Sequence, residues 1–263
     1  MIFFRFCLIY FFSSLLCGSY AQIQIPNVNA DYIKNDPYGN IYAVKDAHLS
    51  KFSPNGKLLY NFSDFTLGTI SSVDVFNPMK IMIFYKDAGA ILFLNEQLAI
   101  INSPISLHDA NYFSISLASY SAANQIHLYQ HSNKYLITLD FNMREISKTP
   151  INFPYFDPKQ MIELEEKSLA FQDPELGVFL FDPFGTFYKS IPVFTSNPVE
   201  VTTELIYYTN NNEVNIYNYI SMSNEKQKLP FSNVAQTLFY RNKMILLLQN
   251  NTIWIYEKNE NRK

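Results

Sequence analysis

Three carboxylic acids have the side-chain chemistry and the sequence positions that a metal site requires. Asp74, Glu163 and Glu200 each lie in a short segment that precedes a longer apolar strand in a repeated unit. Carboxylate oxygens are preferred ligands of hard divalent cations, and a cation held by them could activate a water molecule for hydrolysis. The alternative interpretation is that these side chains are polar because they face water. Both interpretations stay open at the level of the sequence.

A second set of residues could bind a partner. Several segments that connect one predicted unit to the next are rich in aromatic side chains, which dominate the energy of protein interfaces. The candidate partner-binding residues are Phe65, Leu67, His108, Tyr112, Phe113, Phe153, Tyr155, Phe156 and Phe194. The same side chains could instead cover the protein's own core, or they could bind a glycan. We expect a protein partner.

Motifs of well-known catalytic chemistry are absent from the sequence. It contains no Gly-x-Ser-x-Gly pentapeptide around a nucleophile and no glycine-rich phosphate loop. His127 and His131 are four residues apart, but they lie on a predicted strand and the following turn. Their rings are therefore expected to point in different directions and not to share a metal ion. The sequence predicts no catalytic residue, no cofactor and a protein that is not an enzyme.

The elements that must position these residues form a repeat. Each copy consists of an apolar strand, a polar turn and a second apolar strand. A short inner strand is expected before it, as at residues 115–119 and 199–201, and an outer strand after it, which often ends at a proline such as Pro104. The copies are residues 40–52, 80–94, 125–139, 167–181, 204–217 and 243–256. A period of about 40 residues built from short strands is typical of a β-propeller. The sequence therefore predicts an all-β, six-bladed β-propeller whose inner strands line a channel.

The sixth copy lacks an outer strand of its own. It ends at Tyr256, and the residues after it, 257–263, are mostly charged or polar. Near the N-terminus, Ile25-Pro26 matches the Ile191-Pro192 ending of an outer strand. We therefore expect residues 23–26 to complete the last blade, so that the N-terminal strand closes the ring and leaves no open sheet edge.

The first blade resembles the six-bladed propellers of the NHL type. The resemblance is carried by residues 36–44, Asp-Pro-Tyr-Gly-Asn-Ile-Tyr-Ala-Val, and by residues 49–57, Leu-Ser-Lys-Phe-Ser-Pro-Asn-Gly-Lys. It fades in the other five blades and implies the fold alone, since propellers include both enzymes and scaffolds. Six-bladed hydrolases of the lactonase type place metal-binding carboxylates in the channel. By that analogy Asp74, Glu163 and Glu200 form the alternative metal site.

The N-terminal residues have the pattern of an export signal. Arg5 precedes an apolar stretch at residues 6–16, and Ser19-Tyr20-Ala21 provides the small residues that signal peptidase requires. We predict that residues 1–21 are a signal peptide and that residues 22–263 form a single propeller domain. Lipidation at Cys17 is the alternative to cleavage after Ala21. Both cysteines, Cys7 and Cys17, fall in the predicted signal peptide, so disulfide bonds do not contribute to the predicted domain.

Charge and composition narrow the function classes. The net charge is −3, which argues against nucleic acid as a partner. No segment after the signal is long and apolar enough to predict an integral membrane protein. The content of Asn, Tyr, Phe and Ile, with seven glycines, is typical of AT-rich bacterial genomes. We predict an exported, periplasmic scaffold, associated with the outer membrane, that binds envelope or outer-membrane proteins in an assembly or secretion complex. The alternatives are a lactonase-type metal-dependent hydrolase and a glycan-binding module.

Overall fold

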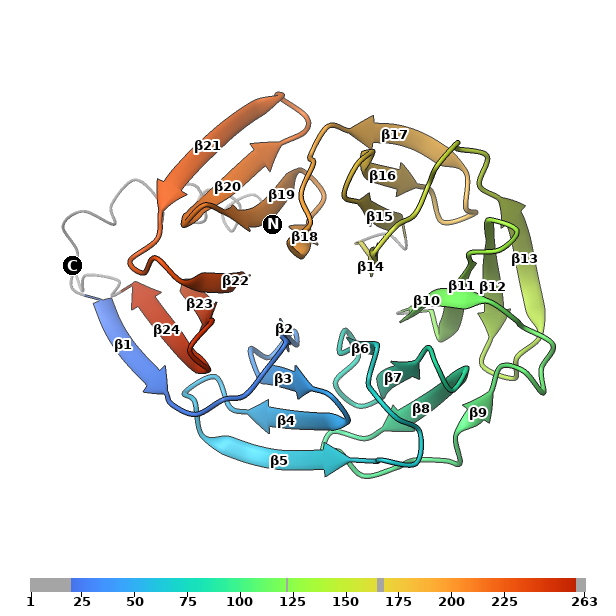
Figure 1. The fold of residues 1–263 in the computed structure, drawn as a ribbon, viewed down its shortest axis with the longest axis horizontal. Coiled ribbons are helices and arrows are strands. Elements are labelled where there is room, and N and C mark those ends of the chain that lie inside the picture. The colour runs from blue at the N-terminus through green and yellow to red at the C-terminus, as the bar shows by residue number, and fades with distance from the viewer. Residues whose placement is uncertain (1–19, 122, 165–167, 259–263) are drawn as a thin grey trace.

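The computed structural model describes residues 20–121, 123–164 and 168–258, which form six four-stranded antiparallel sheets around a central axis (Figure 1). The predicted six-bladed β-propeller is confirmed. The described residues contain no helix, and therefore none that is long and apolar enough to cross a membrane.

Each blade runs from an innermost to an outermost strand. Blade 1 is β2 (Tyr32–Asn35), β3 (Ile41–Lys45), β4 (His48–Phe52) and β5 (Leu58–Ser63). Blade 2 is β6 (Ser72–Asp74), β7 (Ile81–Tyr85), β8 (Ala90–Leu94) and β9 (Ile105–Ser106). Blade 3 is β10 (Ile115–Tyr120), β11 (Gln125–Gln130), β12 (Tyr135–Asp140) and β13 (Glu145–Pro150).

Blades 4 to 6 complete the ring. Blade 4 is β14 (Gln160–Glu163), β15 (Leu169–Asp173), β16 (Gly177–Phe181) and β17 (Phe187–Ile191). Blade 5 is β18 (Val199–Val201), β19 (Leu205–Asn210), β20 (Glu213–Asn218) and β21 (Ser223–Lys228). Blade 6 is β22 (Val234–Tyr240), β23 (Lys243–Leu248), β24 (Thr252–Lys258) and, from the other end of the chain, β1 (Tyr20–Ile25).

The expected closure of the ring by the N-terminal strand is confirmed. β1 is the outermost strand of blade 6 and pairs antiparallel with β24, with Ile25 opposite Ile253 and Gln24 opposite Trp254. The strand begins at Tyr20, three residues before the expected start. Cys7, Cys17 and most of the predicted signal peptide lie outside the described residues.

The core lies between the blades. β7 and β8 are buried at every position, because one face of their sheet packs on blade 1 and the other on blade 3. Aromatic rings fill the wedge between blades 3 and 4, where the Tyr129 and Phe156 ring centroids are 5.8 Å apart and those of Phe156 and Phe179 are 5.1 Å apart. These side chains suit such a gap because each buries a large apolar area.

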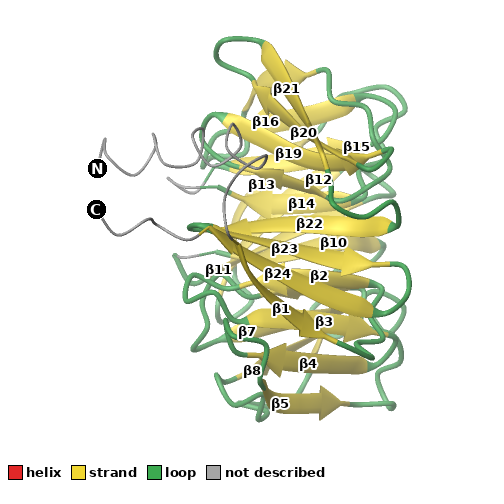
Figure 2. Cartoon of the chain, turned by 90° about the vertical axis from the view of Figure 1, so that its left-hand side faces the viewer, coloured by secondary structure: helices red, strands yellow, loops and turns green. Residues whose placement is uncertain are grey.

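The ring has two faces, which differ in their loops (Figure 2). The connection face carries the segments that lead from an outermost strand to the innermost strand of the next blade, together with the turns between second and third strands. The terminal face carries the turns between first and second strands and between third and fourth strands, and also the first residue of β1 and the last residue of β24.

One turn of the terminal face recurs between third and fourth strands. In four blades a Ser, Asn or Asp side chain accepts hydrogen bonds from backbone N–H groups two and four residues later. These residues are Ser53, Asn95, Asp140 and Asp182. The residue three positions after each has a positive φ, and it is a glycine in only two blades, at Gly56 and Gly185. Side-chain capping therefore fixes a turn that few glycines mark in the sequence.

Candidate binding face and central channel

The three candidate metal-binding carboxylates lie at the channel, on innermost strands. Asp74 is on β6, Glu163 is on β14 and Glu200 is on β18 (Figure 1). Each is half-buried and accepts a hydrogen bond from a neighbouring blade. The donors are the Tyr120 N–H to Asp74 Oδ2 at 3.2 Å, the Ser121 hydroxyl to Glu163 Oε1 at 2.6 Å and the Phe239 N–H to Glu200 Oε2 at 3.3 Å.

The channel also contains a basic side chain, Lys34 on β2. Burial lowers the pKa of Lys34, while the nearby Asp74 and Glu200 raise it. Burial raises the pKa of Asp74, although hydrogen bonds from the N–H groups of Phe76 and Tyr120 and the charge of Lys34 lower it. Burial also raises the pKa of Glu200, to about 8. The surrounding strands therefore favour the neutral forms of these three groups.

The carboxylates serve as links between blades. Two glutamines of the inner strands do the same: Gln236 on β22 both donates to and accepts from the backbone of Ile33, and Gln160 on β14 does so with Val199. Within the described part of the chain, no group of three or more His, Cys, Asp or Glu residues is arranged to hold a metal ion. The hydrogen bonds at the channel therefore indicate that these side chains stabilise the contacts between neighbouring blades.

The aromatic candidates divide into two groups on the connection face. Four rings project from it: Phe65 is 71% exposed, Phe113 is 51% exposed, Tyr155 is 90% exposed and Phe194 is 59% exposed. His108 is exposed as well and stacks on Phe113, with ring centroids 5.4 Å apart. These five residues come from four successive connections between blades.

The other four candidates belong to the core. Leu67, Tyr112 and Phe153 are half-buried and pack against the apolar clusters between blades. Phe156 is 1% exposed and lies among the aromatic rings between blades 3 and 4. Two adjacent residues of one connecting segment can therefore face in opposite directions, as the exposed Tyr155 and the buried Phe156 do.

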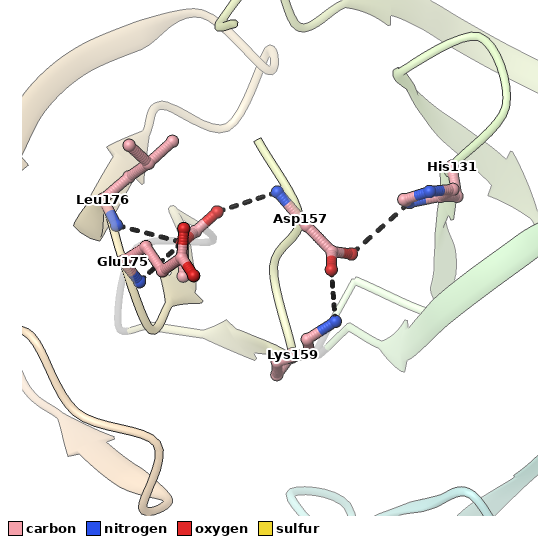
Figure 3. Close-up of polar contacts among 6 residues, drawn as sticks. His131, Asp157, Lys159, Glu175 and Leu176 are labelled. Atoms are coloured by element: carbon pink, nitrogen blue, oxygen red, sulfur yellow. Dashed lines mark hydrogen bonds and ion pairs between the residues drawn. The ribbon is translucent and has the colours of Figure 1, made fainter. Parts of the chain in front are cut away.

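A group of polar and charged side chains lies close in the sequence to Tyr155 on this face. The Asp157 carboxylate is hydrogen-bonded by the Lys159 ammonium and lies 3.6 Å from Nδ1 of His131 (Figure 3). The hydrogen bond from Lys159 holds the pKa of Asp157 below its ordinary value, aided by the charges of Lys159, His131 and Lys86. The Asp157 N–H donates to Asp173 Oδ2 at 2.8 Å, which fastens this segment to blade 4. Sequence reasoning did not find this group, because His131 lies in a different segment from Asp157 and Lys159.

Sequence reasoning also missed the residues that fasten the connections. In most connections an apolar residue donates its N–H to a carbonyl in the turn between the second and third strands of its own blade. The donors are Val28, Ile70, Leu107, Ile151 and Leu229, at 2.7–2.9 Å from the acceptors. All but Leu229 are buried. Except for Ile70, the donors lie within three residues after an outer strand, and an apolar residue at that position is the signal that could have identified them.

Comparisons with known proteins support the fold and go no further. No protein-family model matches the sequence, and no curated protein matches it. Among solved structures, the chain is similar to a virginiamycin B lyase from Staphylococcus aureus with quinupristin, at 11% identity and a TM-score of 0.64, covering 91% of this chain and 99% of that one. It is also similar to the Neurospora crassa Pan2 WD40 domain, at 11% identity and a TM-score of 0.66, covering 93% and 97%.

A third similar structure is BBS1N in complex with ARL6DN, at 15% identity and a TM-score of 0.55, covering 90% of this chain and 78% of that one. These neighbours include a lyase and a chain bound to a protein, so they agree on the β-propeller and not on an activity. The molecule is a six-bladed β-propeller.

Proposed function

We propose that this propeller is a non-enzymatic, exported scaffold that binds another protein through its connection face. The observation that carries this proposal is the set of four large rings exposed on that face, Phe65, Phe113, Tyr155 and Phe194. Exposed apolar side chains gathered on one face of a domain mark interaction surfaces. An aromatic anchor that is buried fully by a partner contributes about 2 kcal/mol or more to binding.

The way the rings are held supports a binding role. Ile70 and Ile151 pin the connections that carry Phe65 and Tyr155 to their own blades. Lys134 donates to the Phe153 carbonyl at 2.9 Å, and Gln130 donates to the Phe113 carbonyl at 2.9 Å. A pinned loop loses little conformational freedom when a partner binds, so more of the contact energy remains as affinity.

The polar surroundings favour a protein as the partner. Asp157, Lys159 and His131 form a polar rim close in the sequence to Tyr155, and protein interfaces commonly have an aromatic centre within a polar rim. The polar rim also supplies specificity, because it penalises partners that place like charges against it.

The proposed compartment is the periplasm, in association with the outer membrane, and the proposed partners are envelope or outer-membrane proteins of an assembly or secretion complex. The basis is the export pattern in residues 1–21, with cleavage after Ala21 or lipidation at Cys17. A hydrolase is not proposed, because Asp74, Glu163 and Glu200 already accept hydrogen bonds that join blades.

The test is capture of partners from envelope extracts with tagged protein. We expect the unaltered chain to retain a discrete set of envelope proteins and the double variant Phe65→Ser with Tyr155→Ser to lose them. The matched control is Phe184→Ser with Met222→Ser, which removes equally exposed side chains from the terminal face. Equal capture by all three proteins would refute the proposal. Retention on peptidoglycan, lost in the same connection-face variant, would instead identify a glycan-binding module.

A further inference from the structure

The terminal face exposes large apolar side chains that the binding role proposed above does not use. They lie in turns of blades 1, 2, 4 and 5. The residues and their exposed fractions are Tyr38 65%, Phe76 45%, Met79 59%, Phe184 79%, Ile220 64% and Met222 74%. Single exposed apolar residues are ordinary on a protein surface, but such a set on one face indicates a site of contact.

Five of the six side chains are presented by the same local geometry. Each follows an Asp or Asn by two positions, and the side-chain oxygen of that residue accepts the N–H of the apolar residue. The pairs are Asp36 with Tyr38, Asp74 with Phe76, Asn77 with Met79, Asp182 with Phe184 and Asn218 with Ile220, at 2.9–3.1 Å. The turns are therefore fixed by their polar residues, while the apolar residue at each tip faces solvent.

In the described turns of this face, the exposed charged side chains are mainly basic. They are Lys57, Arg144, Arg241 and Glu96. Three of these four are basic, although the whole chain has a net charge of −3. Apolar turn tips and basic residues on the same face are the combination that binds the interface of an anionic bilayer.

The chain enters the fold at the same face. β1 begins there with Tyr20 (Figure 2), and the sequence before it contains Cys17 and the apolar stretch of residues 6–16. Only Gly18 and Ser19 separate Cys17 from β1, and three residues of extended chain span at most about 11 Å. A lipid chain on Cys17, or an N-terminal segment held in a bilayer, would therefore keep the terminal face next to the membrane.

We propose that the terminal face docks on an anionic lipid surface. The tips of the turns enter the interfacial layer, and Lys57, Arg144 and Arg241 face the head groups. The connection face then points away from the membrane and remains open to a protein partner.

The test is sedimentation with vesicles, using exported protein that carries Cys17→Ser so that no lipid chain contributes to binding. We expect the protein to bind vesicles of phosphatidylethanolamine with phosphatidylglycerol more tightly than vesicles of phosphatidylcholine. Phe184→Ser with Met222→Ser should weaken binding about ten-fold, since each side chain loses its contact with the interfacial layer. Phe65→Ser with Tyr155→Ser, on the connection face, should bind vesicles as the unaltered protein does.

Three results would overturn the proposal. One is the absence of vesicle binding, and another is undiminished binding by Phe184→Ser with Met222→Ser, since some other part of the chain would then carry it. The third is a dimer in solution that this variant dissociates, because a second copy would then cover the face. Phe65→Ser with Tyr155→Ser should impair only the capture of proteins, and Phe184→Ser with Met222→Ser should impair only the binding of vesicles. Failure of one proposal can therefore be distinguished from failure of the other.

Discussion

At the scale of single residues, Gly177 is the position where the backbone leaves no room for a side chain. It has a φ of +101°, and a Cβ atom there would clash with the backbone carbonyl oxygen of Ile191. Gly68 also has a positive φ, of +82°, but nothing lies within 4 Å of its Cβ position. Comparing the same substitution at the two glycines therefore separates the cost of backbone strain from the cost of steric overlap.

We expect Gly177→Ala to lower the free energy of unfolding by about 3 kcal/mol, from strain and overlap together. Gly68→Ala should cost only about 1 kcal/mol, because the left-handed conformation is its sole penalty. Denaturant unfolding of both variants provides the measurement. Equal losses in the two variants would show that contact with Ile191 is unimportant.

Glu200 makes stability depend on pH in a defined direction. The folded chain raises the pKa of Glu200 from 4.5 to about 8, so the folded state keeps a proton that the unfolded chain releases. The contribution of Glu200 to the free energy of unfolding is therefore fully present below pH 4.5 and is lost as the pH rises through 8. Asp74, whose pKa is also raised, acts in the same direction, whereas Lys34, whose pKa is lowered, acts in the opposite one.

Glu200→Gln should therefore flatten the dependence of the melting temperature on pH between about 5 and 8 and raise stability at pH 8 by roughly 2 kcal/mol. The amide oxygen of the variant can still accept the Phe239 N–H. Glu225→Gln, on the exposed side of β21, serves as the control. A variant with the same pH profile as the unaltered protein would contradict the protonated state inferred for Glu200.

The direction of individual side chains limits what the sequence can predict about a site. The aromatic content of the connections was visible, but Tyr155 is exposed and its neighbour Phe156 is buried. In a loop no fixed period relates sequence position to side-chain direction, unlike in a strand or helix. The inner-strand positions of Asp74, Glu163 and Glu200 were likewise predictable, while their backbone donors from other blades were not.

At the scale of the elements, strands were predictable because their apolar runs are bounded by polar turns. The expected inner strand at residues 199–201 coincides with β18, and the one at residues 115–119 lies within β10. The outer strand of blade 2 was placed wrongly. It was expected to end at Pro104, whereas β9 follows that residue as Ile105–Ser106. Its two residues are too few to give an apolar pattern.

The contribution of β1 to the ring can be measured at one position. Ile25 is buried, and its side chain fits against Gly56 in the turn of the neighbouring blade 1. Ile25→Asp places a carboxylate in that contact and should lower the free energy of unfolding by about 4 kcal/mol, or the melting temperature by roughly 10 °C. Thermal unfolding followed by circular dichroism is the measurement.

Gln24→Asp is the matched control, because Gln24 lies on the same strand and is exposed. It should shift the transition by about 0.5 kcal/mol or less. An unchanged transition in Ile25→Asp would show that ring closure by β1 does not contribute to stability.

At the scale of the whole molecule, the six sheets separate two surfaces that have different chemistry. The connection face carries aromatic rings with a polar rim, and the terminal face carries apolar turn tips and, in its described turns, mainly basic exposed charges. Asp74 links the terminal face to the channel, because it accepts the Tyr120 N–H of the next blade and also the N–H of Phe76 at a turn tip. Substitution of the exposed apolar side chains on either face should leave the stability of the ring unchanged.

The pairing of β1 with β24 also determines how the molecule responds to mechanical force. Gln22 and Tyr256 are opposite each other near the same end of this antiparallel pair. A pull applied at these two residues would load the hydrogen bonds of the ladder one after another rather than all together. The seam would peel open at low force and leave the other five sheets intact, which makes it the mechanically weakest point of a ring that is otherwise continuous.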